Sequence, residues 1–160
     1  MIRLTKVDIR RADLLSATAQ RLILALNAEL ASRYPEDGAT FFRLDAEEVA
    51  EGRGGFFVAY LDDEPVGCGA VRWFEPGVAE IKRMYVAPRA RGQRVARQIL
   101  DVLTAEARRL GAHRLLLETG PRQPEAIALY EHAGFTHIPH YGEYVHNPNP
   151  DLSVCMGKDL

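Results

Sequence analysis

Four arginines lie close together in the middle of the chain: Arg89, Arg91, Arg94 and Arg97. They follow a β-branched and aromatic run at residues 81–86, which predicts a strand, and Pro88, which ends it. A turn containing Gly92 then leads into a long amphipathic pattern, which predicts a helix. The first turn of a helix offers unpaired N–H groups and a positive dipole end, and guanidinium groups fork onto phosphate oxygens. The segment therefore predicts a pyrophosphate site.

The spacing at residues 91–96 is not that of the two commonest phosphate loops, because it contains neither Gly-Lys-Ser/Thr nor G-x-G-x-x-G. It resembles motif A of the GCN5-related N-acetyltransferases, whose usual form is Q/R-x-x-G-x-G/A. The resemblance implies that six residues bind the pyrophosphate of acetyl-CoA, chiefly through backbone N–H groups: Arg91, Gly92, Gln93, Arg94, Val95 and Ala96. Arg94 replaces the middle glycine of the motif, and at this position it is open whether the backbone can approach the phosphate closely.

A second block, from Gln123 through Tyr130 to Phe135, is similar to motif B of the same family, N-x-x-A-x-x-L-Y-x-x-x-G-F. Gln123 takes the place of the asparagine and is expected to bind the cofactor. The resemblance implies that Tyr130 faces the sulfur of coenzyme A and protonates the departing thiolate as a general acid. The alternative is that Tyr130 is a core residue at helical spacing. Almost the whole chain can be laid on the family fold, but only residues 79–135 carry specific motifs.

Two glutamates could accept the proton of the attacking amine. Glu80 lies eleven positions before Arg91, which matches the glutamate base of the histone acetyltransferase branch of the family. Its alternative role is a surface charge that balances Lys82 or Arg83. Glu118 is the second candidate base, and its alternative role is to pair with a neighbouring arginine.

The resemblance also implies a bulge in the strand before motif A. Backbone groups of Met84, Tyr85 and Val86 would then bind the pantetheine arm and polarise the thioester carbonyl. The sequence shows no activated nucleophile, because Cys68 and Cys155 lie in predicted core strands and no G-x-S-x-G motif is present. Direct attack of the amine on the thioester is the expected mechanism.

The acceptor of the acetyl group is expected to be a small-molecule primary amine. The resemblance implies an acceptor pocket built from the first two helices and the loop between the last strands. In these regions the chain has several aromatic residues and one cation: Tyr34, Phe41, Phe42, Arg43, Tyr141 and Tyr144. A further aromatic residue, Trp73, lies on the third predicted strand. Such a set suits an amine with an apolar or carboxylate group, although most of these residues could simply cover the end of the sheet. A protein lysine or α-amino terminus is the alternative acceptor, and a non-catalytic CoA-binding sensory module is the alternative function. The loop at residues 138–150 would crowd an extended peptide.

The elements that must position these residues predict an α/β (α+β) fold. Apolar patterns place strands at residues 2–9, 56–61, 66–73, 78–87, 113–118, 135–138 and 152–156. Helices are expected from Asp13 or Ser16 onward, at 45–51, at 92–110 and at 123–133. The apolar stripe of the first helix is expected to be Leu15, Ala19, Leu22, Leu26 and Leu30. This order predicts one domain over residues 1–160, with a mixed, largely antiparallel sheet and helices on both faces.

Composition excludes several other classes. With 160 residues, 47% hydrophobic content and a net charge of −2, the chain predicts no nucleic-acid or membrane partner. Residues 81–114 are nevertheless locally basic, with nine Lys/Arg against two acids. No apolar leader or spanning segment is present, so a cytoplasmic location is expected. The two cysteines predict buried thiols, and the three histidines at 137, 140 and 146 predict an exposed loop rather than a metal site. Many relatives form homodimers, but no feature specifies an interface.

Overall fold

The computed structural model describes residues 6–36 and 44–160, which form one seven-stranded sheet with the order β1-β2-β3-β4-β5-β7-β6. All neighbouring strands are antiparallel except β4 and β5. The strands are β1 (Val7–Ala12), β2 (Gly54–Leu61), β3 (Glu64–Glu75), β4 (Val78–Val86), β5 (Arg114–Thr119), β6 (Thr136–His137) and β7 (Val154–Asp159). The helices are α1 (Ala17–Arg33), α2 (Val95–Arg109) and α3 (Pro124–His132). The predicted mixed, largely antiparallel sheet is confirmed.

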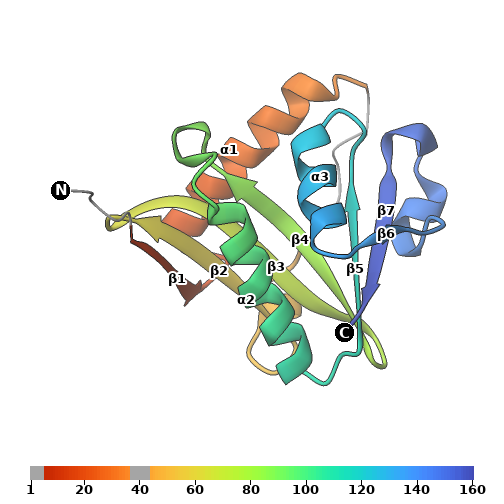
Figure 1. Ribbon diagram of the computed structural model, residues 1–160, viewed down its shortest axis with the longest axis horizontal. Coiled ribbons are helices and arrows are strands. Elements are labelled where there is room, and N and C mark those ends of the chain that lie inside the picture. The colour runs from red at the N-terminus through yellow and green to blue at the C-terminus, as the bar shows by residue number, and fades with distance from the viewer. Residues whose placement is uncertain (1–5, 37–43) are drawn as a thin grey trace.

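Helices cover both faces of the sheet, as predicted, with α2 and α3 on one face and α1 on the other (Figure 1). The side chains of β2 alternate between the two faces, and both faces are buried. Phe57 and Ala59 face the core formed with α2, whereas Phe56 and Val58 face the core formed with α1. Successive residues of a strand point to opposite faces, so a strand buried on both sides reads as a continuous apolar run.

The helix α1 begins after Ser16, whose Oγ accepts the N–H of Ala19 at 3.2 Å. The expectation that Leu15 belongs to the buried stripe is wrong, because Leu15 precedes the cap and is 69% exposed. Leu14 is buried instead. The strand predicted from residue 2 begins at Val7 within the described residues and continues to Ala12, and residues 2–5 lie outside them.

Three other predicted boundaries differ from the structure. The segment expected as a helix at 45–51 is a single 3₁₀ turn, η1 (Ala46–Val49), because the backbone becomes extended at Ala50 (ψ 151°). The helix α2 begins at Val95 rather than at Gly92, since Gly92 and Arg94 have positive φ. The last strand runs over Val154–Asp159, where it pairs with the whole of β5.

The strand β4 carries the bulge that the family resemblance implied. Its pairing with β3 passes from Ala70↔Lys82 to Cys68↔Tyr85, so β4 has one extra residue, and Arg83 there has a φ of +58°. Just before the bulge, β4 also separates from β5, since the parallel pairing covers only the four residue pairs from Val78↔Arg114 to Ile81↔Leu117. Figure 1 shows β4 and β5 diverging toward their carboxyl ends. An open α/β sheet binds ligands at such a point.

Both cysteines are buried, as predicted, and neither forms a disulfide within the described residues. The Cys68 thiol donates to the carbonyl oxygen of Arg83 at 3.3 Å, and burial raises its pKa to about 12. In residues 6–36 and 44–160 no helix is long and apolar enough to cross a membrane.

Candidate active site

Two adjacent cavities open where β4 and β5 separate. The first, the α2-side cavity, has a volume of 220 Å³ and lies between the end of β4, the turn before α2 and the helix α3. The second, the β5-side cavity, has a volume of 120 Å³ and lies between β4, the end of β5 and α1. They share the residues Leu26, Met84, Gln123, Ala126 and Tyr130. The two cavities therefore meet at Tyr130 and at the bulge of β4.

The α2-side cavity collects most of the residues expected to bind the cofactor: Met84, Tyr85, Val86, Arg91, Gly92, Val95, Ala96 and Gln123. Gln93 and Arg94 do not line it. The backbone N–H groups of residues 92–97 have no acceptor within the described chain. Left-handed φ values at Gly92 (+79°) and Arg94 (+63°) turn the chain tightly into α2. This turn and the helix start together present a set of unpaired donors at the positive end of a helix dipole, which suits a phosphate group.

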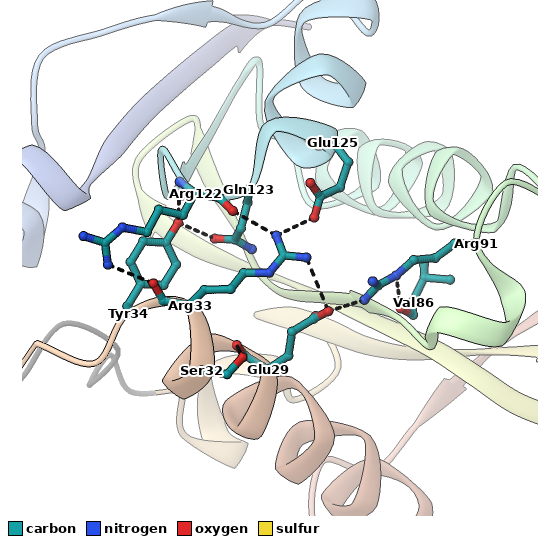
Figure 2. Close-up of polar contacts among 9 residues, drawn as sticks. All are labelled: Glu29, Ser32, Arg33, Tyr34, Val86, Arg91, Arg122, Gln123 and Glu125. Carbon is teal, nitrogen blue, oxygen red and sulfur yellow. Dashed lines mark hydrogen bonds and ion pairs between the residues drawn. The ribbon is translucent and has the colours of Figure 1, made fainter.

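Of the four clustered arginines, Arg91 lines the cavity and the other three do not. Its Nε donates to the carbonyl oxygen of Val86 at 3.0 Å, and its Nη2 lies 2.5 Å from Glu29 Oε1 on α1 (Figure 2). Arg89 instead donates to the carbonyl oxygen of Pro65, and Arg97 pairs with Asp101 one helical turn away. The expectation that all four converge on one anion is wrong, because helical spacing and nearby acceptors direct them apart.

The carboxyl end of α1 is tied to the loop before α3 by polar contacts (Figure 2). The buried Tyr34 hydroxyl accepts the N–H of Arg122 at 2.9 Å and donates to Gln123 Oε1 at 3.4 Å. Arg33 pairs with Glu125 at 2.5 Å and donates to the carbonyl oxygen of Arg122 at 3.0 Å. These contacts hold Gln123 at the border between the two cavities, and no local sequence pattern predicts them because the partners lie up to 92 residues apart.

The Tyr130 side chain is buried and lines both cavities. Its ring packs edge-on against Phe135, with a centroid separation of 5.8 Å. The Tyr130 hydroxyl has no hydrogen-bond partner in the described part of the chain, yet no fully buried polar side-chain atom there is left without a partner. The hydroxyl therefore opens onto the cavity. Burial, assisted by the negative charge of Glu118, raises the pKa of Tyr130, so the phenol is protonated and able to donate.

The Glu80 side chain is 1% exposed and does not line either cavity. Its carboxylate lies 2.8 Å from Arg72 Nε and accepts the Tyr141 hydroxyl at 2.5 Å. Arg72 also pairs with Glu48 at 2.5 Å. The alternative of an exposed charge that balances Lys82 or Arg83 is wrong, because the carboxylate is enclosed by Arg72 and Tyr141 between β3, β4 and the loop before β7.

The Glu118 side chain lines the β5-side cavity, in which Tyr130 also lies. It accepts the Ser153 hydroxyl at 2.7 Å and forms no ion pair within the described residues, so the alternative of an arginine partner is wrong. Burial raises the pKa of Glu118 to about 8, and the negative charges of Glu80 and Glu143 act in the same direction. A carboxylate with a near-neutral pKa in a cavity has the properties of a general base.

The aromatic residues expected around the acceptor are only partly brought together. Tyr34 and Tyr144 line the β5-side cavity, whereas Trp73 is 36% exposed and lines neither cavity. The Tyr141 hydroxyl donates a hydrogen bond to Glu80, and Tyr141 does not line the cavity. Phe41, Phe42 and Arg43 lie outside the described residues. The cavity also contains Lys82 and Arg83, which sequence reasoning treated only as partners of Glu80.

No cluster of three or more His, Cys, Asp or Glu side chains that could hold a metal occurs in residues 6–36 and 44–160. The site instead combines unpaired amides, an arginine, a tyrosine hydroxyl and a carboxylate around the gap between two parallel strands. This combination, with a bulged β4, suits the transfer of an acyl group from a thioester that carries a pyrophosphate.

The chain belongs to the Acetyltransferase (GNAT) family, whose family model matches residues 22–135. It is 39% identical over 155 residues to the IAA acetyltransferase of Azospirillum brasilense, which covers 96% of this chain and 98% of that protein. A solved structure from Klebsiella pneumoniae, assigned as an acyl-CoA N-acyltransferase, has a TM-score of 0.79 and 33% identity, covering 96% of this chain and 97% of that one. A Bacillus subtilis acetyltransferase in complex with CoA shares the fold, with a TM-score of 0.67 at 19% identity and coverage of 97% and 99%.

Proposed function

We propose that this acetyltransferase transfers the acetyl group of acetyl-CoA to the primary amine of a small molecule. The observation that carries the proposal is the junction of the two cavities at Tyr130 and the β4 bulge. One cavity offers unpaired amides and Arg91 to a pyrophosphate, and the other offers a carboxylate to an amine. The reacting atoms would meet where the cavities join.

The loop beside the β5-side cavity supports a small acceptor. The 3₁₀ turns η3 (Gly142–His146) and η4 (Pro150–Leu152) occupy the loop before β7, where an extended peptide would need to lie. The IAA acetyltransferase relative, named for a small molecule, favours the same class of acceptor.

The side chains at the junction divide the work of acyl transfer. Glu118 accepts a proton from the amine, whose nitrogen attacks the thioester carbon, and the backbone N–H groups at the β4 bulge stabilise the developing oxyanion. As the carbon–sulfur bond breaks, Tyr130 donates its proton to the thiolate. The proton held by Glu118 then returns to the tyrosinate through solvent, so that the products are an amide and a free thiol. Glu118 is favoured over Glu80 as the base because Glu80 does not reach either cavity.

The test is a thiol-release assay with acetyl-CoA and a panel of primary amines, with product masses measured in parallel. Acetylation of one or more small amines, at a rate well above hydrolysis without acceptor, is the expected result. Transfer only to peptide lysines or to protein α-amino groups would identify a protein acceptor instead. CoA binding with no transfer to any amine or peptide would favour a sensory module.

A further inference from the structure

The hydrogen-bond partner of Glu118 is the hydroxyl of Ser153, which comes from the neighbouring strand. Glu118 on β5 lies opposite Cys155 on β7, so Ser153, two residues before Cys155, is on the same face of the sheet as Glu118. Ser153 is 5% exposed, and its Oγ donates to Glu118 Oε2 at 2.7 Å. The register of the sheet therefore places a buried hydroxyl against the carboxyl group that lines the β5-side cavity.

The direction of this hydrogen bond is set by Asn147, which is also buried. The backbone N–H of Asn149 can only donate, and it donates to Asn147 Oδ1 at 2.9 Å. The amide nitrogen of Asn147 therefore faces the other way, and its Nδ2 donates to Ser153 Oγ at 2.7 Å. Because Ser153 Oγ accepts this bond, its own proton is directed to Glu118. The Asn147–Ser153–Glu118 network thus ends on one carboxylate oxygen.

The backbone around this network is restricted as well. Asn147 and Asn149 each precede a proline, which disfavours helical backbone, and Asn147 is extended (ψ 124°). The N–H of Ser153 donates to the carbonyl oxygen of Pro150 at 3.1 Å, and its own carbonyl oxygen accepts His140 Nε2 at 2.9 Å. Ser153 is therefore held through both backbone groups and through its side chain.

The second oxygen of Glu118 has a different environment. Within residues 6–36 and 44–160, Oε1 has no hydrogen-bond partner, whereas no fully buried polar side-chain atom lacks one. Oε1 is therefore not fully buried, and it opens onto the cavity that Glu118 lines. Ser153 can donate to Oε2 whether the carboxyl group is ionised or protonated, so an incoming proton is left to Oε1.

We propose that Ser153 and Asn147 are positioning residues for the base: they hold Glu118 Oε2, so that Oε1 faces the amine and takes its proton. This inference rests on the proposed function and adds the residues that orient its base. The last torsion of a glutamate side chain is broad, so a carboxyl group without a fixed partner samples many orientations. Fixing one oxygen raises the share of molecules in which the other oxygen is placed to react.

The experiment is a double-mutant cycle between Ser153→Ala and Glu118→Gln, with thiol release from acetyl-CoA and the best amine of the panel as the readout. All kcat/KM values are taken at the high-pH plateau, where Glu118 is ionised in every variant that has it. Ser153→Ala alone should lower kcat/KM by about tenfold, which corresponds to one hydrogen bond to a charged group. Added to Glu118→Gln, it should lower kcat/KM by less than about twofold, because no base is left to orient.

A purely structural serine gives a different pattern, since its loss would reduce kcat/KM by the same factor in both backgrounds. The matched control is Ser32→Ala, which removes an exposed hydroxyl that donates to the carbonyl oxygen of Glu29 on α1. This variant should keep the wild-type kcat/KM. The rise in melting temperature caused by CoA should be unchanged in Ser153→Ala, because Ser153 does not line the α2-side cavity.

Asn147→Asp tests the direction of the network. The new carboxyl group can still accept the N–H of Asn149, but it replaces the donor to Ser153 with a second acceptor. Two carboxyl groups then compete for one hydroxyl proton, so kcat/KM at the plateau should fall about as far as in Ser153→Ala. Combining the two substitutions should lower kcat/KM by less than about threefold beyond Ser153→Ala alone, because Asn147 acts through Ser153.

Each outcome decides the inference. It is overturned if Ser153→Ala keeps kcat/KM within about twofold of the wild type, or if its effect is equal with Glu118 and with Glu118→Gln. Independent effects of Asn147→Asp and Ser153→Ala would overturn the role of Asn147. If Ser153→Ala is no longer stabilised by CoA, the cycle of Asn147→Asp with Glu118→Gln decides in its place. The failure of the proposed function is distinguishable, since the wild type would then acetylate no amine or Glu118→Gln would keep full activity.

Discussion

Replacement of Glu118 by glutamine tests the centre of the site most directly. Glu118→Gln keeps the side-chain size and can still bind the Ser153 hydroxyl, but it cannot accept a proton. If Glu118 is the base, kcat/KM should fall by roughly 10²–10⁴, the usual contribution of general base catalysis. The CoA-induced rise in melting temperature should be unchanged, because Glu118 does not line the α2-side cavity.

The pH dependence follows from the pKa of about 8. About a tenth of Glu118 is ionised at pH 7 and about nine tenths at pH 9, so the ionisation of Glu118 should contribute a roughly tenfold rise in the kcat/KM of the wild type between them, in addition to the rise caused by deprotonation of the amine. The Ser153 hydroxyl lowers the pKa of Glu118, so Ser153→Ala should move the rise to higher pH by about one unit or less. The titratable groups that face Glu118 and must be considered with it are Tyr34, Glu80, Lys82, Tyr130, Glu143, Tyr144 and Cys155.

The same carboxyl group links stability to pH. Between about pH 4.5, its ordinary pKa, and about pH 8, the folded state keeps a proton that the unfolded state loses. The free energy of unfolding should therefore fall with rising pH across this window, and Glu118→Gln should remove that part of the fall. The difference between variant and wild type should grow by about 2–4 kcal/mol from pH 4.5 to pH 9, measured by urea unfolding.

The assay measures the initial rate of thiol release from pH 6 to 10 with one amine that the wild type acetylates. Because every variant is assayed with the same amine, the titration of the amine affects all pH profiles equally, and differences between them report on the enzyme. Glu131→Gln, at an exposed position on α3, is the matched control and should follow the wild-type profile. If Glu118→Gln retains kcat/KM within threefold and an unchanged profile, Glu118 is not the base. In that case Glu80, enclosed by Arg72 and Tyr141, would have to be reconsidered.

Three further substitutions test the other parts of the site. Tyr130→Phe keeps the buried ring, so the melting temperature should stay within about 2 °C of the wild type. The kcat should fall by roughly 10²-fold, near the low end for general acid catalysis, because a thiolate is a fairly good leaving group without protonation. Wild-type turnover in this variant would remove Tyr130 from the mechanism. Arg91→Ala should weaken CoA binding by about 1–3 kcal/mol in calorimetry, and unchanged affinity would exclude this turn as the pyrophosphate site. Arg94→Gly relieves a left-handed backbone, so the free energy of unfolding measured by urea titration should rise by up to about 1 kcal/mol. Because Arg94 does not line the α2-side cavity, the affinity of this variant for CoA should stay within about twofold of the wild type. A larger fall in affinity, with a flatter salt dependence, would indicate a contact between the Arg94 side chain and a phosphate.

Local patterns predicted much of the architecture. The apolar run at residues 81–86 and the punctuation by Pro88 and Gly92 correctly placed β4, a turn and α2, because strand and helix periods are properties of neighbouring residues. Element ends were less accurate where a cap or a positive φ decided them. Leu15 and the start of α2 are examples, since hydrophobic spacing does not show where a backbone turns left-handed.

Only the tertiary structure distinguishes the two candidate general bases. Glu80 and Glu118 look alike in sequence, each being a carboxylate in an apolar strand. In the fold, Arg72 from β3 and Tyr141 from the loop before β7 enclose Glu80, whereas Glu118 faces a cavity with Ser153 as its hydrogen-bond partner. These partners lie up to 61 residues away along the chain, so no local pattern could separate the two carboxylates.

The sequence by itself determined the family, the order of the elements and the turn that offers unpaired amides, because each of these depends on residues close together in the chain. Only the tertiary structure decided which side chains share a cavity: Lys82, Arg83, Glu118 and Tyr130 come from β4, β5 and α3. The physical reason is that burial and charge set the chemistry of these groups, and both depend on which distant segments pack around them.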